Sequence, residues 1–177
     1  NRELAAEIWA REEPRSVRAA LNLAYGMERT QGLKMAQQYL DRFVAEKRDS
    51  VGLRLQSLVS ACTMEPDADH SKQLADVKHS IATLPYEGWA TDIVEKLMET
   101  VRKQACQGVS TDQVAEIAAA FLSQPAYQCS RPTAHNMLML IGLVTMEHGD
   151  TRQAMELYLR ALQESVSYSM AAFYFDL

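Results

Sequence analysis

Residues 134–163 read AHNMLMLIGLVTMEHGDTRQAMELYLRALQ, and this stretch decides the fold. Apolar residues recur at three- and four-residue steps on both sides of Gly149, which predicts two amphipathic helices with a turn between them. Gly142 and Ala154 are small residues that let two antiparallel helices approach, and Tyr158 is the large residue that packs between them. The stretch therefore predicts a tightly packed helical hairpin.

The same helical period runs through the rest of the chain, and strict alternation of apolar and polar residues with β-branched residues is missing. We therefore expect an all-α domain. The expected helices are 3–12, 16–30, 32–46, 51–64, 71–83, 89–105, 111–124, 134–148 and 152–165, with a last one beginning near Ser169.

Several expected helix ends carry their own signals. Residues whose side-chain oxygen can accept the free amides of a first helical turn precede three helices. They are Asp49 or Ser50, Ser110 or Thr111, and Asp150 or Thr151. The prolines are expected between helices, where a missing N–H costs nothing. They are Pro14, Pro66, Pro85, Pro125 and Pro132.

The hairpin around Gly149 resembles a tetratricopeptide repeat. A second, degenerate match lies near the start of the chain, where Ala24 and Ala36 have the same spacing as Gly142 and Ala154. The resemblance implies a tetratricopeptide-like α-solenoid of about five antiparallel helical hairpins that form a single domain over residues 1–177.

The expected repeat is irregular in the middle. Ala24 and Gly142 are 118 residues apart, which is not a multiple of the period of about 34 residues. Tetratricopeptide-like hairpins are therefore expected at about 17–48 and 135–168, with atypical helices over about 62–132. A stack of hairpins tolerates such units, because each contacts mainly its neighbours.

Residues 8–24, IWAREEPRSVRAALNLA, are similar to a segment of certain bacterial polytopic membrane proteins. There it joins the last transmembrane helix to a repeat domain, as in relatives of oligosaccharide transferases and O-antigen ligases. The resemblance implies a position on the periplasmic face of the inner membrane, with the cytoplasm as the alternative. The chain begins without Met and ends on an apolar segment, so we expect it to be a fragment of a longer chain.

Composition limits the class of protein. Hydrophobic residues make up 47% of the chain and charged residues 23%, which predicts an ordered fold. A net charge of -5 without a basic patch argues against nucleic acid as a partner. No apolar run reaches the length that spans a bilayer, so we expect no direct membrane insertion by these residues.

Three cysteines, Cys62, Cys106 and Cys129, are scattered too widely for a zinc or Cys-x-x-Cys redox site. Cys106 ends one expected helix and Cys129 follows the next, so both are expected at the same end of a hairpin. A disulfide between these two is one hypothesis for an oxidising compartment. Two unrelated, partly buried thiols are the other.

The remaining candidates for chemistry are sparse. The four histidines lack the spacing of helical metal ligands, and residues 67–70, DADH, are expected to form a solvated loop that caps the next helix. Neither a phosphate-binding loop nor a nucleophile turn occurs. We therefore expect no catalysis, no metal and no cofactor.

In tetratricopeptide arrays the first helix of each hairpin lines a concave groove. Carried over to this chain, the resemblance places Arg18, Asn22 and Tyr25 on one groove surface and Asn136, Met139 and Leu143 on another. The first set mixes charged, amide and aromatic groups, as a peptide-binding surface does, although an ordinary exposed helix face fits it equally. The second set is apolar and fits burial by neighbouring helices at least as well, so only Arg18, Asn22 and Tyr25 are predicted as partner-binding residues.

The sequence thus predicts a non-catalytic scaffold that binds a protein or peptide, or the membrane part of its own chain. One alternative is a periplasmic accessory domain of a membrane-bound glycan transferase or ligase. The other is a cytoplasmic regulator that senses a peptide through the same groove.

Overall fold

The computed structural model describes residues 17–46, 50–85, 87, 89–104, 106–125 and 131–175. Every named element within these residues is an α-helix, which confirms the all-α prediction. The helices are α2 (Val17–Gln31), α3 (Leu33–Glu46), α4 (Val51–Met64), α5 (Ser71–Thr83), α6 (Ala90–Lys103), α7 (Thr111–Ser123), α9 (Arg131–Glu147) and α10 (Thr151–Phe175). The helix expected at 3–12 lies outside the described residues.

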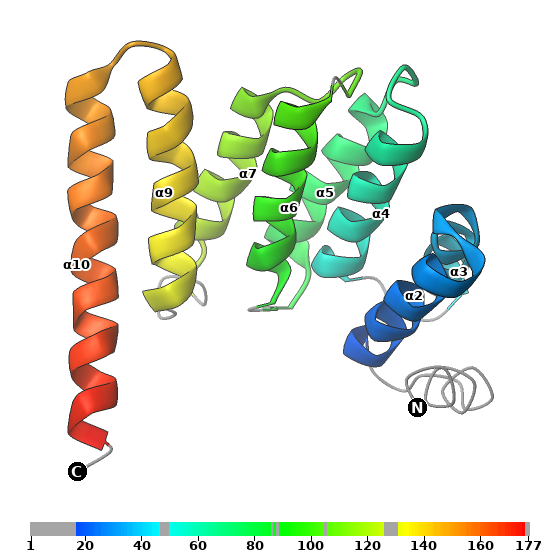
Figure 1. Ribbon diagram of the computed structural model, residues 1–177, viewed down its shortest axis with the longest axis horizontal. Coiled ribbons are helices and arrows are strands. Elements are labelled where there is room, and N and C mark those ends of the chain that lie inside the picture. The colour runs from blue at the N-terminus through cyan, green and yellow to red at the C-terminus, as the bar shows by residue number, and fades with distance from the viewer. Residues whose placement is uncertain are drawn as a thin grey trace.

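Helices that follow one another along the chain pack in pairs: α2 with α3, α4 with α5, α6 with α7, and α9 with α10. The pairs also pack against each other, because α3 contacts α4, α4 contacts α6, and both α6 and α7 contact α9. Figure 1 shows the helices from α4 to α10 side by side. The chain thus forms a row of helical pairs, in which α6 and α9 are neighbours.

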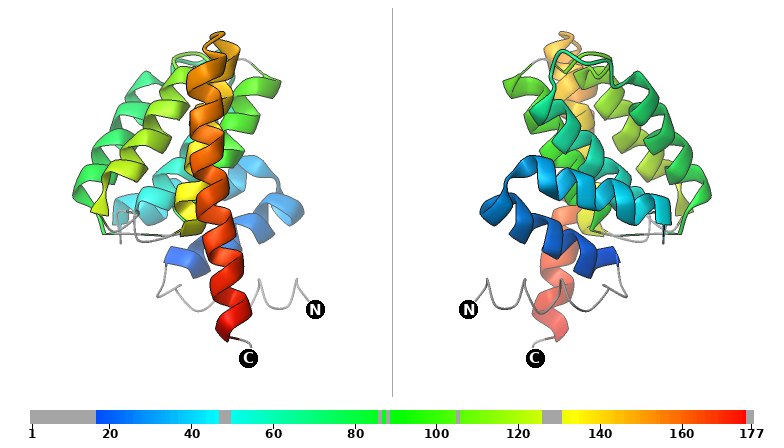
Figure 2. Two further views of the ribbon diagram at one scale, coloured as in Figure 1. Left: turned by 90° about the vertical axis from the view of Figure 1, so that its left-hand side faces the viewer. Right: turned by 90° about the vertical axis from the view of Figure 1, so that its right-hand side faces the viewer.

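The first pair departs from the direction of the others. Figures 1 and 2 show α2 and α3 lying across one end of the row, at a steep angle to the helices that follow, while α10 stands at the opposite end. Gly32, between α2 and α3, has a φ of +90°, a left-handed conformation that glycine adopts without steric cost. This residue permits the tight turn within the first pair.

Three of the expected caps are present. Ser50 and Asp150 each accept a hydrogen bond from the amide three residues later, at 3.4 and 3.0 Å. Ser110 accepts from the Gln113 amide at 3.3 Å while the Gln113 side chain accepts from the Ser110 amide at 2.9 Å, so the two form a capping box. Gly149 has a φ of +85°, as the turn before α10 requires.

The expected close approach of α9 and α10 is confirmed. A Cβ on Gly142 would lie 2.6 Å from Cε1 of Tyr158, so the ring occupies the space that a side chain would need. Ala154 is fully buried beside it. A second such contact, between Gly52 of α4 and the ring of Trp89 before α6, was not predicted; there a Cβ would lie only 2.0 Å from the indole. Small residues therefore set helix spacing in two places.

Most of the buried apolar side chains form one cluster that extends from α2 to α9. Its large, fully buried members include one from each of five helices: Leu40, Leu58, Leu97, Phe121 and Met137. Helices such as α6 bury one stripe and leave the opposite stripe in water, as the three- and four-residue spacing predicted, whereas α4 is buried on nearly all sides.

Two expectations about helix boundaries were wrong. A break was expected between residues 165 and 169, but α10 runs unbroken from Thr151 to Phe175, because this segment contains no Pro or Gly to end it. Pro132 was placed between helices and instead lies in the first turn of α9, where its missing N–H has no helical partner to lose. None of the described helices is both long and apolar enough to cross a membrane.

Candidate binding groove

The first predicted binding surface, on α2, is partly engaged by contacts within the protein. The side chain of Arg18 lies outside the described residues, and Asn22 is exposed. The Tyr25 hydroxyl donates to Gln56 Oε1 at 3.0 Å, and Lys96 Nζ lies 5.0 Å from the centroid of the Tyr25 ring. Tyr25 therefore links α2 to α4 and α6 and offers less free surface than the sequence indicated.

The second predicted set lines a groove of about 640 Å³ between α6, α9 and α10. Asn136 and Leu143 are half-buried and Met139 is 42% exposed, so neighbouring helices do not cover this face of α9. Leu140 of α9 and Tyr158 of α10 complete this side of the lining. The structure thus places the second set, which was not selected as a binding surface, in a concavity.

The other side of the groove belongs to α6, and sequence reasoning missed it. Four charged side chains on α6 line the groove at helical spacing: Asp92, Glu95, Lys96 and Glu99. The opposite stripe of α6 is buried in the core, which fixes the direction in which the charged stripe points. A charged stripe on a helix is usually only solvated surface, so the available signal was too general to indicate a groove.

Electrostatics distinguish Glu95 from its neighbours. The groove removes part of the water around this side chain, which raises the pKa of Glu95, and the nearby charge of Asp92 raises it further. A hydrogen bond with Asn136 and the proximity of His135 act in the opposite direction and lower it. Glu95 is therefore a carboxylate whose negative charge its surroundings only partly compensate.

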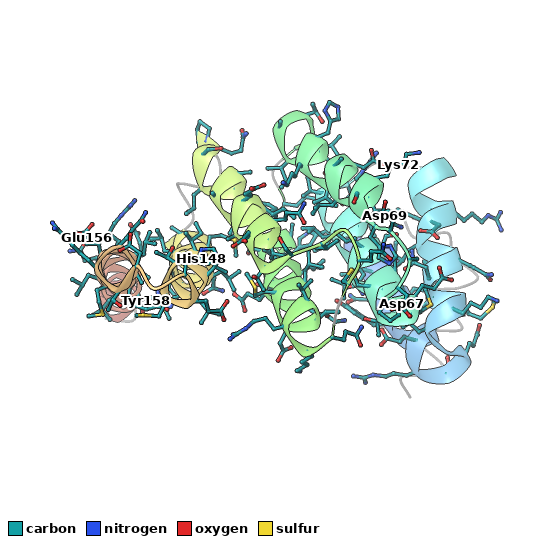
Figure 3. The ribbon with its side chains drawn as sticks, turned by 90° about the horizontal axis from the view of Figure 1, so that it is seen from above. Asp67, Asp69, Lys72, His148, Glu156 and Tyr158 are labelled. Carbon is teal, nitrogen blue, oxygen red and sulfur yellow. A yellow bond between two sulfur atoms is a disulfide. The ribbon has the colours of Figure 1, made fainter. Side chains whose placement is uncertain are left out.

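The position of α9 in the groove depends on α10. His135 Nδ1 is hydrogen-bonded to the carbonyl of Ala161 at 2.7 Å, so that nitrogen is the donor. Further along the pair, the Tyr158 ring fills the space over Gly142. In Figure 3 Tyr158 lies on the side of α10 that faces α9, whereas Glu156 lies on the outer side. The tightly packed pair thus holds the apolar side of the groove rigidly.

The predicted disulfide between Cys106 and Cys129 is corrected, because Cys106 has a different partner. Cys62, in the last turn of α4, and Cys106, after α6, form a disulfide with a Cα–Cα distance of 5.2 Å. Cys129 lies outside the described residues. The prediction failed because it considered one hairpin only, whereas the loop after α6 meets the loop of the preceding pair. Both cysteines of the bond are buried.

Hydrogen bonds reinforce the same junction between the α4–α5 loop and the α6–α7 loop. The His70 amide donates to the Gln107 carbonyl, and the Gln107 amide donates to the Pro66 carbonyl, both at 2.9 Å. The Gln104 side chain donates to the Cys62 carbonyl at 2.9 Å. We call the residues of these two loops, 62–71 and 104–110, the loop junction.

Cys62, Cys106 and His70 of the loop junction place three possible metal-ligand atoms within 4.8 Å of one another. The two sulfurs are bonded to each other, however, and both nitrogens of the buried His70 ring are engaged. Nδ1 is 2.8 Å from Gln73 Oε1, and Nε2 is 2.8 Å from the Glu65 carbonyl. The disulfide leaves neither cysteine as the thiolate that a metal ion binds, and Nε2, which faces the carbonyl acceptor, carries a proton in place of a free lone pair.

The acidic string in the same junction acts as expected, as a cap. Asp69 accepts hydrogen bonds from the amide and hydroxyl of Ser71, the first residue of α5, at 2.9 and 2.6 Å. These two bonds lower the pKa of Asp69. Figure 3 shows Asp67 and Asp69 along this exposed loop, with Lys72 at the start of α5.

The chain was compared with families, with curated proteins and with solved structures. No family model, no curated protein and no solved structure matches it.

Proposed function

We propose that this chain is a non-catalytic scaffold that binds a segment of a partner protein, or a peptide, in the groove between α6, α9 and α10. The observation that carries the proposal is the groove itself. A concavity of about 640 Å³ with an apolar side and a charged side is within the size range of ligand sites. The described residues that line the groove include no Ser, Thr, Cys or His, the side chains that most often form a nucleophile–base pair, so we favour binding over catalysis.

The architecture supports the same proposal. Rows of helical pairs present the first helix of successive pairs on one face, and α6 and α9 are first helices of their pairs. The small–large contact of Gly142 with Tyr158, together with the Gly149 turn, matches the mechanics of a tetratricopeptide repeat. In such arrays this face is where partner segments bind.

The disulfide favours one of the two alternative functions. Disulfides persist in oxidising compartments and are rare in the cytoplasm. The Cys62–Cys106 bond therefore favours the periplasmic accessory domain of a membrane-bound glycan transferase or ligase over a cytoplasmic peptide sensor. In the periplasmic case the groove would hold a protein acceptor or another part of the parent chain.

A random peptide library displayed on phage tests the proposal. Peptides selected on the 177-residue chain should bind in the micromolar range and lose about tenfold in affinity with Met139→Asp, because this change puts a charge on the apolar side of the groove. The matched control is Met155→Asp. Met155 is 50% exposed on α10 and does not line the groove, so affinity should stay within about twofold.

Selected peptides that bind both aspartate variants equally well would refute the groove as the binding site. A failure to select any peptide above background would count against the scaffold function as a whole. Circular dichroism of both variants establishes that they are folded.

A further inference from the structure

The two sides of the groove differ in chemistry. Among the described residues that line it, α6 contributes three carboxylates and one ammonium group, so the formal charge of that side is 1 − 3 = −2. The α9 side contributes Met139, Leu140 and Leu143. A ligand that fills the groove therefore has to satisfy an acidic side and an apolar side at once.

The one cation among these lining residues is already engaged. Lys96 Nζ lies over the ring of Tyr25, at 5.0 Å from its centroid, a distance at which a cation–π contact forms. This contact draws the ammonium group toward α2. The carboxylates of Asp92, Glu95 and Glu99 line the groove at spacings of three and four residues, which puts them on one stripe of α6. Glu99 also pairs with Lys103 at 3.1 Å, so Asp92 and Glu95 carry most of the uncompensated negative charge of this side.

The carboxylates on the acidic side of the groove repel one another when no ligand is bound. Asp92 and Glu95 are one helical turn apart, and the charge of Asp92 disfavours the ionised form of Glu95. A positive charge from outside would relieve this repulsion, whereas a negative one would increase it. Complementarity of charge thus excludes acidic segments and phosphate backbones as occupants and favours basic ones.

The apolar side adds a second requirement. Met139 is 42% exposed at the groove and is flexible enough to fit side chains of several shapes. Leu140 and Leu143 lie half-buried beside it, which makes a continuous apolar strip along α9. A ligand with only positive charge would leave this strip in water.

We propose that the occupant of the groove is a positively charged polypeptide segment whose Lys or Arg side chains contact Asp92 and Glu95 while a neighbouring bulky apolar side chain packs on Met139 and Leu143. This inference rests on the proposed binding function and specifies the chemistry of the partner.

The peptides recovered from the phage selection provide the test. They should be enriched in Lys and Arg next to bulky apolar residues, relative to the unselected library. Their affinity for the Asp92→Asn/Glu95→Gln variant should fall about fivefold or more, since each exposed charge pair contributes about twofold to fivefold. The loss should shrink at high salt, where charges are screened.

Glu156→Gln is the matched control. Glu156 lies on the outer side of α10, away from the groove, and pairs with Arg152 at 3.3 Å (Figure 3). This variant removes one negative charge, as the single variant Glu95→Gln does, so the two single variants are compared directly, and a purely global charge effect would weaken binding equally in both. Binding to the control should stay within about twofold of wild type.

The outcomes separate the two proposals. Peptides that respond to Met139→Asp but are not enriched in Lys or Arg, or that bind the Asp92→Asn/Glu95→Gln variant as tightly as wild type, overturn the basic occupant and leave the scaffold function standing. Peptides weakened equally by Glu156→Gln also overturn it. If no selected peptide responds to Met139→Asp, both proposals fail.

Discussion

The loop junction and the groove lie in the same row of helices but are built on opposite principles. In the loop junction the polar groups of His70 and Gln107 have hydrogen-bond partners, and a disulfide joins the two loops. In the groove, carboxylates of like charge face water beside an exposed Met139. The paired groups of the loop junction stabilise the folded chain, whereas the neighbouring like charges of the groove lower its stability.

The difference separates a region that stabilises the fold from the region where we propose that a partner binds. Buried polar groups that are fully paired rigidify a structure and leave nothing for a ligand. Carboxylates of like charge next to exposed apolar surface cost stability, and proteins keep such costly features where function needs them. Substitutions in the two regions should therefore have opposite signatures: a loss of stability in the loop junction and a loss of binding in the groove.

Removal of the disulfide should have the largest effect. The bond closes a loop with a sequence separation of 44, so replacing Cys62 and Cys106 by Ala should lower the free energy of unfolding by about 3–4 kcal/mol. Urea denaturation with and without a thiol reductant measures this. Reductant should destabilise the wild type and leave the double variant unchanged.

The same double variant tests the contrast between the regions. Where it is folded, it should bind groove-selected peptides within about twofold of wild type, because the loop junction lies outside the groove lining. A tenfold loss of affinity in the folded double variant would show that the two regions are coupled and would break the comparison.

Replacement of His70 should have the next largest effect. His70→Leu removes the ring bonds to Gln73 and to the Glu65 carbonyl inside a buried site, and should cost about 1–3 kcal/mol. The midpoint of thermal unfolding measures the change. His148→Gln is the matched control: His148 is exposed and pairs with Asp112 at 3.0 Å, so the effect should stay below about 0.5 kcal/mol.

A smaller effect is expected at Gly142, which supports the apolar side of the groove. In Gly142→Ala the new methyl group would meet the Tyr158 ring, and overpacking of about 1–3 kcal/mol would exceed the gain of about 1 kcal/mol in helix propensity. The net loss should be about 1 kcal/mol. In a Tyr158→Leu background the same change should become neutral or stabilising. An equal cost in both backgrounds would mean that the ring does not set the helix spacing.

Local features of the fold were predictable because a few neighbouring residues determine them. Ser50, Ser110 and Asp150 cap the helices that follow, and Gly149 adopts the left-handed turn. The close approach of Gly142 and Tyr158 also follows from spacing within one hairpin. The disulfide was not predictable in this way, because its partner depends on which loops meet, and Cys62 belongs to another pair of helices.

The groove was half predictable. The spacing of Asn136, Met139 and Leu143 placed them on one face of α9, but it did not show whether a neighbouring helix covers that face. The α6 side was missed because Asp92, Glu95 and Glu99 have the pattern of any solvated helix surface. Only the contact between α6 and α9 turns the two stripes into one concavity.

The smallest effect on stability is expected at Glu95, and its sign opposes that of every change in the loop junction. Burial and the Asp92 charge raise the pKa of Glu95 above its ordinary value of 4.5, so the folded chain holds the proton more tightly than the unfolded chain does. Protonated Glu95 therefore stabilises the folded wild type below the ordinary pKa, and this contribution is lost as pH rises through the raised pKa of the folded state. Glu95→Gln, which cannot ionise, escapes this loss.

Relative to wild type, Glu95→Gln should thus gain stability between pH 4 and neutrality, by under about 1 kcal/mol because solvent screens the exposed side chain. Urea denaturation of both proteins across that pH range measures the difference, which should level off above the raised pKa. A variant that binds basic peptides less well and unfolds less easily would show that Glu95 is kept at a cost to folding. If Glu95→Gln instead loses stability relative to wild type as pH rises, the ionised Glu95 is a stabilising ion-pair partner. The groove would then be stabilised by its charges as the loop junction is by its hydrogen bonds, and the contrast between the two regions would be wrong.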